Sequence, residues 1–340
     1  MKHQLPPNSQ SNNGSSPKAT VQLASRECLA PYRTHNSEVL HSALTFGDDP
    51  TTRVWSMRRV DRLQALACWR LLSWDSEVLG SPSGSVGGLW AEGDYAEQCH
   101  RLETVLKSCI ADAEAHGVHF LSTRLPEGAI APLHAVEGVG FRIIESFLTF
   151  SRKTAGEISF EGGSDFQIRL AQPDEMEAVV SIAHHAFQSF RLRVDPQIPE
   201  SRACHSRREW VRNGFKGRAD AIYVAEIEDR PVGFALLRSK TDTEKTGEIE
   251  LIAVEPRFRG RGIGKALVAR AIQHYQGKTS VIQVGTQAKN LQAIRLYIRM
   301  GFSIIRSELS FHRHSDGIAM TESLPSTEGK AAHGLTVERA

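Results

Sequence analysis

The stretch that decides the fold is GEIELIAVEPRFRGRGIGKALVARAIQHY, residues 247–275. Its first part alternates apolar and polar residues and ends at Pro256, a pattern that predicts a strand. Gly260, Gly262 and Gly264 then form a turn without side chains. Apolar residues at helical spacing follow the turn: Ala266, Leu267, Val268 and Ile272. The stretch therefore predicts a strand, a bare turn and a helix in direct succession.

A helix that begins over bare glycine backbone is a site for phosphate, because its first N–H groups are unpaired and its dipole is positive there. Four basic residues surround this turn: Arg257, Arg259, Arg261 and Lys265. Two alternatives stay open at this point, a simple tight turn and a basic patch for nucleic acid. The spacing is not the GxGxxG dinucleotide fingerprint, and no interleaved aromatics favour nucleic acid.

A second pattern lies downstream. TSVIQVGTQ, residues 279–287, predicts a strand, and KNLQAIRLYIRMGF, residues 289–302, predicts a short helix. Asn290 and Tyr297 lie seven residues apart, close to two helical turns, so they share one face of that helix. Considered separately, Asn290 is typical of an N-cap and Tyr297 of a core.

Upstream, the chain alternates strand and helix patterns. FQIRL predicts a strand, Pro173 opens a helix, and a further helix covers Glu200–Asn213. The segment 221–239 predicts two strands around a tight turn at Asp229-Arg230.

The chain also repeats itself. GFRIIESFLTF, residues 140–150, matches GFSIIRSELSF, residues 301–311, at seven of eleven positions. Chance similarity between two apolar strands explains the aliphatic positions but not the shared Gly-Phe and serine. A repeat this distant, in a chain of 340 residues, indicates two whole domains.

The first copy lacks the features of the second. The repeat places Val136 at the position of Tyr297 and Ala129 at that of Asn290. Glu92 and Asp94 stand where the second copy has its arginines and glycines. Carboxylates at a helix N-terminus suit its dipole but repel phosphate, so we expect the first copy not to bind a phosphorylated ligand.

These motifs resemble the GNAT acetyltransferase superfamily. RGRGIG after a strand is similar to its R/Q-x-x-G-x-G/A acetyl-CoA motif, and the segment from Asn290 to Phe302 is similar to its last helix. The resemblance implies an α/β (α+β) fold with tandem GNAT-like domains, a mixed central sheet flanked by helices, and a degenerate N-terminal copy. We expect a disordered arm over 1–50, the degenerate domain over 51–157, the catalytic domain over 164–314 and a disordered tail over 315–340.

The resemblance also implies roles for residues. Tyr297 corresponds to a general acid that protonates the leaving thiolate. The residues expected to hold acetyl-CoA, a cosubstrate, are Ile252, Ala253, Val254, Arg259, Gly260, Arg261, Gly262, Ile263, Gly264, Lys265, Asn290, Ala293 and Tyr297. The chemistry is direct attack of an amine on the thioester, and a backbone N–H near Val254 can stabilise the oxyanion.

The general base stays open between two carboxylates. Glu248 and Glu250 share a strand face, and either could act through a water. We expect Glu250 to be the catalytic one, with a solvated strand carboxylate as the alternative.

The acceptor is suggested by LLSWDSEVLGSP, residues 71–82. It resembles the W-[DE]-S-x-F-F-G stretch of acetyltransferases that act on dTDP-linked 4-amino-4,6-dideoxy (fucosamine-type) sugars, although Val78-Leu79 replace the aromatic pair. The resemblance implies that Trp74, Asp75, Ser76 and Asp195 contact a nucleotide-linked amino sugar. A buried tryptophan beside a turn is an equal alternative. Arg191 and Arg193 could meet a diphosphate or only water.

Composition sets the remaining expectations. A net charge of +2, no membrane-length apolar run and no secretory signal predict a cytoplasmic protein without nucleic-acid or membrane partners. Five cysteines without a CxxC predict free thiols, and the histidine pairs lack metal-ligand spacing, so no metal is expected. The alternatives to a nucleotide-sugar acceptor are a protein or small-molecule amine, or a coenzyme A sensor without turnover. The oligomeric state stays open, with a homodimer among the alternatives.

Overall fold

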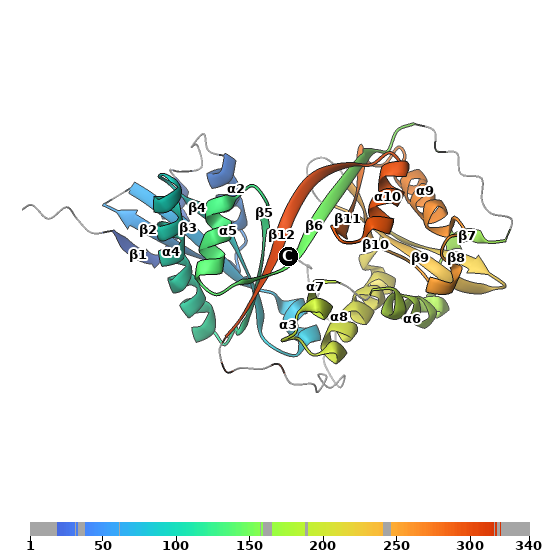
Figure 1. Ribbon diagram of the computed structural model, residues 1–340, viewed down its shortest axis with the longest axis horizontal. Coiled ribbons are helices and arrows are strands. Elements are labelled where there is room, and N and C mark those ends of the chain that lie inside the picture. The colour runs from blue at the N-terminus through green and yellow to red at the C-terminus, as the bar shows by residue number, and fades with distance from the viewer. Residues whose placement is uncertain are drawn as a thin grey trace, which may run out of the picture.

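The structure, a computed structural model, is built on one continuous sheet of twelve strands in the order β1-β2-β3-β4-β5-β12-β6-β11-β10-β9-β8-β7. It describes residues 19–30, 32, 38–60, 62–156, 158, 165–187, 190–240, 246–315, 317 and 320. Figure 1 shows two lobes, each with helices packed on the sheet, joined by the long strands β6 and β12 in the centre. The predicted α/β fold with two similar copies is confirmed.

The first copy supplies the strands of one lobe. Its elements are β1 (Thr20–Leu23), α1 (Arg26–Leu29), α2 (Glu38–Phe46), β2 (Arg53–Arg59), β3 (Arg62–Leu71), α3 (Ser73–Leu79), β4 (Ser83–Ala91), α4 (Tyr95–Ala115), β5 (Phe120–Pro126), α5 (Ile130–Gly138) and β6 (Arg142–Lys153). Buried apolar residues of α4 and α5 form the larger of its cores against the sheet.

The second copy repeats the order of the six strands and of the last two helices, but α3 has no counterpart among its described residues. Its elements are β7 (Gln167–Leu170), η2 (Pro173–Glu175), α6 (Met176–Ala186), α7 (Arg191–Val194), α8 (Glu200–Asn213), η3 (Gly214–Arg218), β8 (Ala221–Ile227), β9 (Arg230–Ser239), β10 (Thr246–Val254), η4 (Pro256–Phe258), α9 (Ile263–Tyr275), β11 (Val281–Gln287), α10 (Leu291–Arg299) and β12 (Ser303–His314). Helices α9 and α10 cover one face of its sheet, and α6 and α8 cover the other.

The two repeated segments lie side by side as the central strands. β6 and β12 pair antiparallel, with Leu309 opposite Ser146 and Ser307 opposite Leu148. β12 lies between β5 and β6 of the first copy, and β6 lies between β11 and β12 of the second. In the first copy β5 and β6 are separated by the width of one strand, and β12 of the second copy lies between them. In the second copy β11 and β12 are separated in the same way, and β6 of the first copy lies between them. We call this arrangement the exchange of strands. Neither half of the sheet is complete without the other.

The strand before the glycine turn leaves its neighbour. β10 and β11 pair in parallel only over Thr246–Ile249, and the register of β10 against β9 shifts between Ile249 and Leu251. Glu250 therefore sits in a bulge, after which β10 diverges from β11. β4 and β5 of the first copy diverge in the same way after Ser85. Both copies thus contain a V-shaped opening in the sheet.

The structure corrects the expected N-terminal arm. Within residues 1–50, β1 pairs with β2 and α2 packs on the sheet, with Leu40 completely buried and Leu44 nearly so. Their apolar side chains are spaced three to four residues apart, which is sufficient for an amphipathic helix. Residues 1–18 of the expected arm and 321–340 of the expected tail lie outside the described residues.

The turn between β8 and β9 is at Glu228 and Asp229, which have positive φ, one residue earlier than expected. All five cysteines are free. Among the described residues, no helix has the length and apolar character needed to span a membrane.

Candidate active site

One cleft of about 1710 Å³ crosses the centre of the molecule and is lined by both copies. One end lies at the glycine turn before α9, and the other lies among α3, α7, α8 and the central strand β6. All the residues predicted to hold acetyl-CoA line this cleft except Arg261. The Arg261 guanidinium is instead 3.6 Å from the Asp165 carboxylate.

The glycine turn leaves the start of α9 open. Gly260 and Gly262 have φ values of 83° and 84°, which favour glycine, and a Cβ added at either would meet nothing within 4 Å. Gly262 is the N-cap of α9 and offers no side chain to its N–H groups. These N–H groups are free for an anion, with the Lys265 ammonium in the same wall. The turn therefore fits the pyrophosphate of coenzyme A.

The corresponding turn of the first copy is closed by its own side chains. Asp94, the N-cap of α4, accepts a hydrogen bond from the N–H of Glu97 at 2.9 Å, and the Glu97 carboxylate accepts one from the N–H of Asp94. A Cβ at Gly93 would lie 2.3 Å from a carboxylate oxygen of Glu97. The helix end is occupied and negatively charged, as the sequence predicts.

Between β10 and β11 the cleft is lined by backbone. Because the two strands stop pairing after Ile249, the groups of Ile252–Val254 that face β11 have no strand partner there. Such groups can hydrogen-bond an extended ligand arm as a neighbouring strand would.

Tyr297 closes this part of the cleft from α10. Its ring packs against Phe150 of β6 and Phe302, and its side chain is only 3% exposed. Burial raises the pKa of the hydroxyl well above its usual range, so it stays protonated at neutral pH. No described residue is hydrogen-bonded to this hydroxyl. It is thus available to give its proton to a ligand in the cleft.

Asn290 is the N-cap of α10. Its Oδ1 accepts a hydrogen bond from the N–H of Ala293 at 3.3 Å, and its Nδ2 donates to Thr286 Oγ1 at 3.1 Å. The side chain therefore fixes the start of the helix that carries Tyr297, while still lining the cleft. Both expected roles of Asn290 are compatible with this position.

Glu250 is surrounded by donors. Its carboxylate accepts hydrogen bonds from the guanidinium groups of Arg218, at 2.5 and 3.1 Å, and of Arg238 at 3.4 Å. The indole N–H of Trp210 donates to it at 3.2 Å. Glu248 pairs with Lys240 at 3.6 Å. Two arginines neutralise Glu250, so it is better placed to orient a polar group than to remove a proton directly.

The far end of the cleft combines aromatic rings and arginines. Trp74 of α3 and Trp210 of α8 meet edge to face with ring centroids 5.3 Å apart. The Arg207 guanidinium lies over the rings of Phe187 and Phe190. Rings and guanidinium groups suit an acceptor that has both flat apolar faces and negative charge.

Residues 180–302 match the acetyltransferase (GNAT) family. The chain contains a GNAT acetyltransferase domain. It is also 27% identical over 254 residues to the spore coat polysaccharide biosynthesis protein SpsD of Bacillus subtilis (strain 168), a match that covers 74% of this chain and 84% of that protein. The catalytic activity of the GNAT domain is acetyl-CoA-dependent acyl transfer.

Two solved structures have a similar fold. A GCN5-related N-acetyltransferase from Sphaerobacter thermophilus has a TM-score of 0.62, covering 88% of this chain and 97% of that one at 15% identity. A tandem GNAT protein from the clavulanic acid biosynthesis pathway has a TM-score of 0.53, covering 87% and 98% at 14% identity. At these identities the likeness shows a shared fold and no more.

The expected acceptor residues separate into two pairs in the GNAT structure. Trp74 and Asp75 line the cleft. Ser76 and Asp195 do not: the Ser76 hydroxyl donates to the carbonyl of Leu72 and accepts from the N–H of Ser83. Direct contact of Ser76 and Asp195 with the acceptor is therefore corrected to a structural role.

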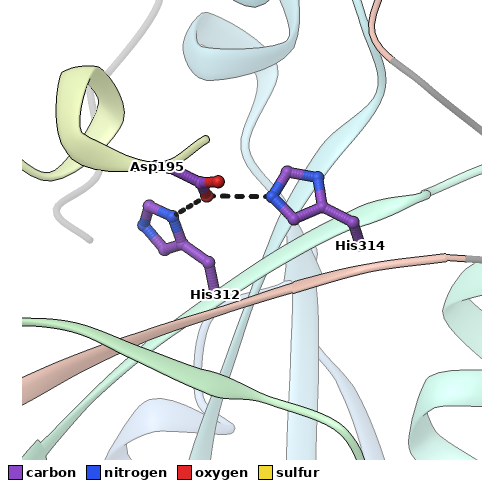
Figure 2. A group of neighbouring side chains, drawn as sticks. All are labelled: Asp195, His312 and His314. Atoms are coloured by element: carbon purple, nitrogen blue, oxygen red, sulfur yellow. Dashed lines mark hydrogen bonds and ion pairs between the residues drawn. The ribbon is translucent and has the colours of Figure 1, made fainter. Parts of the chain in front are cut away.

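Asp195 belongs to a buried cluster with two histidines of β12 (Figure 2). Asp195 Oδ2 lies 2.6 Å from His312 Nδ1 and 2.9 Å from His314 Nε2. Burial opposes ionisation of Asp195, but hydrogen bonds from both histidines outweigh it and lower the pKa of the carboxyl. Burial lowers the pKa of His312 to about 4, opposed by Asp195 and assisted by Arg191.

This cluster has the geometry of hydrogen bonds rather than of metal ligands. Ligands about 2.1 Å from an ion are separated by more than 3 Å, whereas Asp195 and His312 are in direct contact. The other nitrogen of His312 lies 3.2 Å from a guanidinium nitrogen of Arg191. The cluster therefore fixes β12 to α7 and aims Arg191 into the cleft.

Sequence reasoning missed the cleft residues of the first copy. Glu145, Phe147 and Thr149 of β6 line the cleft beside Arg124 of β5. Their period-two spacing, with a carboxylate in an apolar strand, was a detectable signal. β6 brings these residues to the second copy because it pairs with β11 and β12. No pattern in the sequence indicates this pairing.

Proposed function

We propose that this chain transfers the acetyl group of acetyl-CoA to the amine of a nucleotide-linked amino sugar. The observation that carries the proposal is the single cleft that extends from an open helix N-terminus to an aromatic, arginine-rich end built by both copies. A lysine side chain or small amine needs only the reacting end of such a space. An acceptor that is bulky and negatively charged far from its amine would use all of it.

Acetyl-CoA supplies an activated thioester carbonyl when it is bound. The N–H groups at the start of α9 hold its pyrophosphate, and the backbone of Ile252–Val254 holds its extended arm. The N–H groups of this segment that face β11 stabilise negative charge on the carbonyl oxygen. Asn290 keeps α10 in register so that Tyr297 faces the sulfur.

The amine nitrogen attacks the carbonyl carbon, a C–N bond forms and the C–S bond breaks. Tyr297, which burial keeps protonated at neutral pH, donates its proton to the sulfur as it leaves. The amine loses one proton, and Glu250 accepts it through a bridging water or orients the amine for its loss. The Arg218 and Arg238 contacts favour the orienting role.

The acceptor class has two supports. Trp74 and Asp75, from the stretch that resembles sugar-nucleotide acetyltransferases, line the cleft. SpsD, a relative whose match covers 74% of this chain, is named for polysaccharide biosynthesis. A protein or small-molecule amine is the alternative acceptor.

An acceptor comparison tests the proposal. Release of free thiol from acetyl-CoA is followed with a dTDP-linked 4-amino sugar, the free amino sugar and a lysine peptide. Binding energy from the remote nucleotide should serve catalysis, so the free sugar should lose turnover as well as affinity. A peptide that outperforms the nucleotide sugar would refute the acceptor and leave the GNAT assignment intact.

A further inference from the structure

Three arginines from three elements converge on the acceptor end of the cleft. They are Arg124 of β5, Arg191 of α7 and Arg207 of α8. A guanidinium nitrogen of Arg124 is 3.5 Å from the Glu145 carboxylate. One of Arg191 is 3.9 Å from the Asp75 carboxylate. These carboxylates partly compensate the first two arginines.

Arg207 forms no ion pair of this kind with any residue that the structure describes, although the charges of Glu145 and Glu250 act on it from a longer distance. Among the residues that the structure describes, no carboxylate forms an ion pair with it, and its buried Nε has no hydrogen-bond partner. Its guanidinium lies 4.3 Å from the ring centroid of Phe190 and 4.8 Å from that of Phe187. Burial lowers the pKa of Arg207 to about 10, so it remains charged at neutral pH. Arg207 is half-buried, and a cation held there without an ion-pair partner destabilises a fold, which points to a ligand.

The surrounding charges favour an incoming anion. Burial is the main cause that lowers the pKa values of Arg124 and Arg207, and the positive charge of Arg191 is the second. Glu145, 7% exposed, is the carboxylate that all three arginines face, and three cations exceed its single charge. With Asp75 added, three cations still exceed two carboxylates, and Glu250, which also acts on Arg207, is already paired with Arg218 and Arg238.

We propose that Arg207, together with Arg124 and Arg191, binds a phosphoryl group of the acceptor. Planar guanidinium groups pair with phosphoryl oxygens through two parallel hydrogen bonds. In the nucleotide-linked sugar, on which this identification of the ligand rests, the bound group is the diphosphate. The tryptophans Trp74 and Trp210 flank the same end and would contact the sugar or the base.

This site differs from the one at α9. The cations beside the coenzyme pyrophosphate are Arg259 and Lys265, in the turn before and the first turn of α9. The anion site is built on β5, α7 and α8, on the acceptor side of Glu250, whose charge acts on Arg207. One site should therefore stay free when coenzyme A fills the other.

Inorganic pyrophosphate is the probe, titrated by calorimetry into protein saturated with coenzyme A. Wild type should bind one pyrophosphate, and Arg207→Met should weaken this binding at least 10-fold. The matched control is Arg208→Met, the next residue of α8, whose side chain lines a separate small pocket with Glu177 and Arg212. Unchanged binding in Arg207→Met, or equal weakening in both variants, would overturn the proposal.

Stability separates a ligand-binding arginine from a structural one. Arg207→Met removes an uncompensated charge and keeps an apolar chain against the rings, so its melting temperature should equal or exceed that of wild type. A lower melting temperature with unchanged pyrophosphate binding identifies a structural arginine and overturns the proposal. If Arg207→Met does not fold, Arg207→Lys replaces it, with several-fold weaker binding expected because the paired geometry is lost.

Acceptor kinetics distinguish failure of this site from failure of the proposed function. If the nucleotide sugar is acetylated with the same KM by wild type and Arg207→Met, the anion site is refuted and the function stands. If pyrophosphate binding depends on Arg207 but the nucleotide sugar is not acetylated, the site stands and the function is refuted. A rise of at least 10-fold in the KM of the nucleotide sugar, without a rise for the free amino sugar, supports both.

Discussion

The helix that follows the diverging strand begins differently in the two copies. In α4, Asp94 and Glu97 form a reciprocal pair of hydrogen bonds with the first backbone N–H groups. Glu92, just before it, is 2.8 Å from a guanidinium nitrogen of Arg62. In α9 the same place holds Gly262 at positive φ, with open space where a side chain would be. The N–H groups at the start of α4 are hydrogen-bonded by carboxylates of the same helix end, whereas no side chain of the described residues caps the start of α9.

This difference shows what binding requires of the fold. A capped helix start contributes about 1 kcal/mol of stability, but it uses the N–H groups that a phosphate would need. A helix start without capping side chains lacks that stability, but the positive end of its dipole is accessible to an anion. The first copy has the stabilising arrangement and contributes walls to the cleft, while the second has the open helix start that we propose as the phosphate site.

The helices α5 and α10 extend the comparison. α5 begins after Ala129 and α10 after Asn290, so the alignment of the repeats is confirmed by the helix boundaries. Val136 of α5 is completely buried, and Tyr297 occupies the equivalent place in α10. The same fold position holds a packing residue in one copy and, in the other, the tyrosine that we propose as the proton donor.

The largest effect should come from separating the copies. Residues 165–315 alone would have a gap between β11 and β12, since β6 fills it in the whole chain. Unpaired backbone on both sides of the gap should prevent a stable fold. We expect this fragment to be insoluble or unfolded by circular dichroism, and co-expression with residues 19–156 to rescue it. A folded monomeric fragment that binds acetyl-CoA would show that the second copy is independent.

Exchanging the proton donor should have the next largest effect. Tyr297→Phe should lower turnover by roughly 10²–10⁴-fold, because only the hydroxyl is removed. Acetyl-CoA affinity should change little, since the ring remains packed against Phe150. The matched change in the first copy, Val136→Ala, should cost roughly 2 kcal/mol of stability and leave turnover unchanged. Wild-type turnover in Tyr297→Phe across pH 6–9 would make Tyr297 a core residue only.

Converting the open helix end into the closed one tests the comparison directly. Gly262→Asp places the residue of α4 at the start of α9, and its charge should weaken acetyl-CoA binding about 100-fold. Gly262→Ala carries the same backbone strain without the charge, so it should bind more tightly than Gly262→Asp. Calorimetry should also find one coenzyme A site per chain in wild type. Two equivalent sites, or equal affinities of both variants, would contradict the role assigned to this turn.

The sequence predicted those parts of the site that are contiguous in the chain. The strand, glycine turn and helix of residues 247–275 were recognisable because each has a local pattern. At the acceptor end the sequence pointed to Trp74, Asp75 and Arg191, which line the cleft. Arg124, Glu145 and Arg207 were not predictable, because they come from three elements that only the exchanged strands bring together. Exchange itself is invisible in the sequence, since the two similar strands could each pair within its own copy. The helix containing Leu40 was missed because the polar residues before it dominated the composition of the first fifty positions.

The smallest effect concerns the exchanged strands themselves. The repeat aligns His312 of β12 with Ser151 of β6, so only one of the two strands carries the buried contact to Asp195. Arg191, in turn, contacts the other nitrogen of His312. If this contact holds β12 in place, stability should depend on pH through His312.

The direction follows from proton binding. The folded state holds His312 neutral until about pH 4, whereas the unfolded chain protonates it near pH 6.5. Between these values the unfolded state binds more protons, so stability is complete above pH 6.5 and falls as the pH is lowered towards 4. The loss amounts to about 3 kcal/mol at most, at 1.36 kcal/mol for each pH unit.

His312→Asn keeps a donor for Asp195 but cannot titrate in this range. Urea unfolding at pH 7.5, 6.0, 5.0 and 4.5 should therefore show a smaller loss of stability in this variant than in wild type. His134→Asn is the control, since His134 is exposed in the first copy and hydrogen-bonded only at its surface, to Tyr95. Its pH dependence should match that of wild type. If His312→Asn loses as much stability as wild type over this range, the buried contact does not set the pH response, and the two exchanged strands are held by their backbone pairing alone.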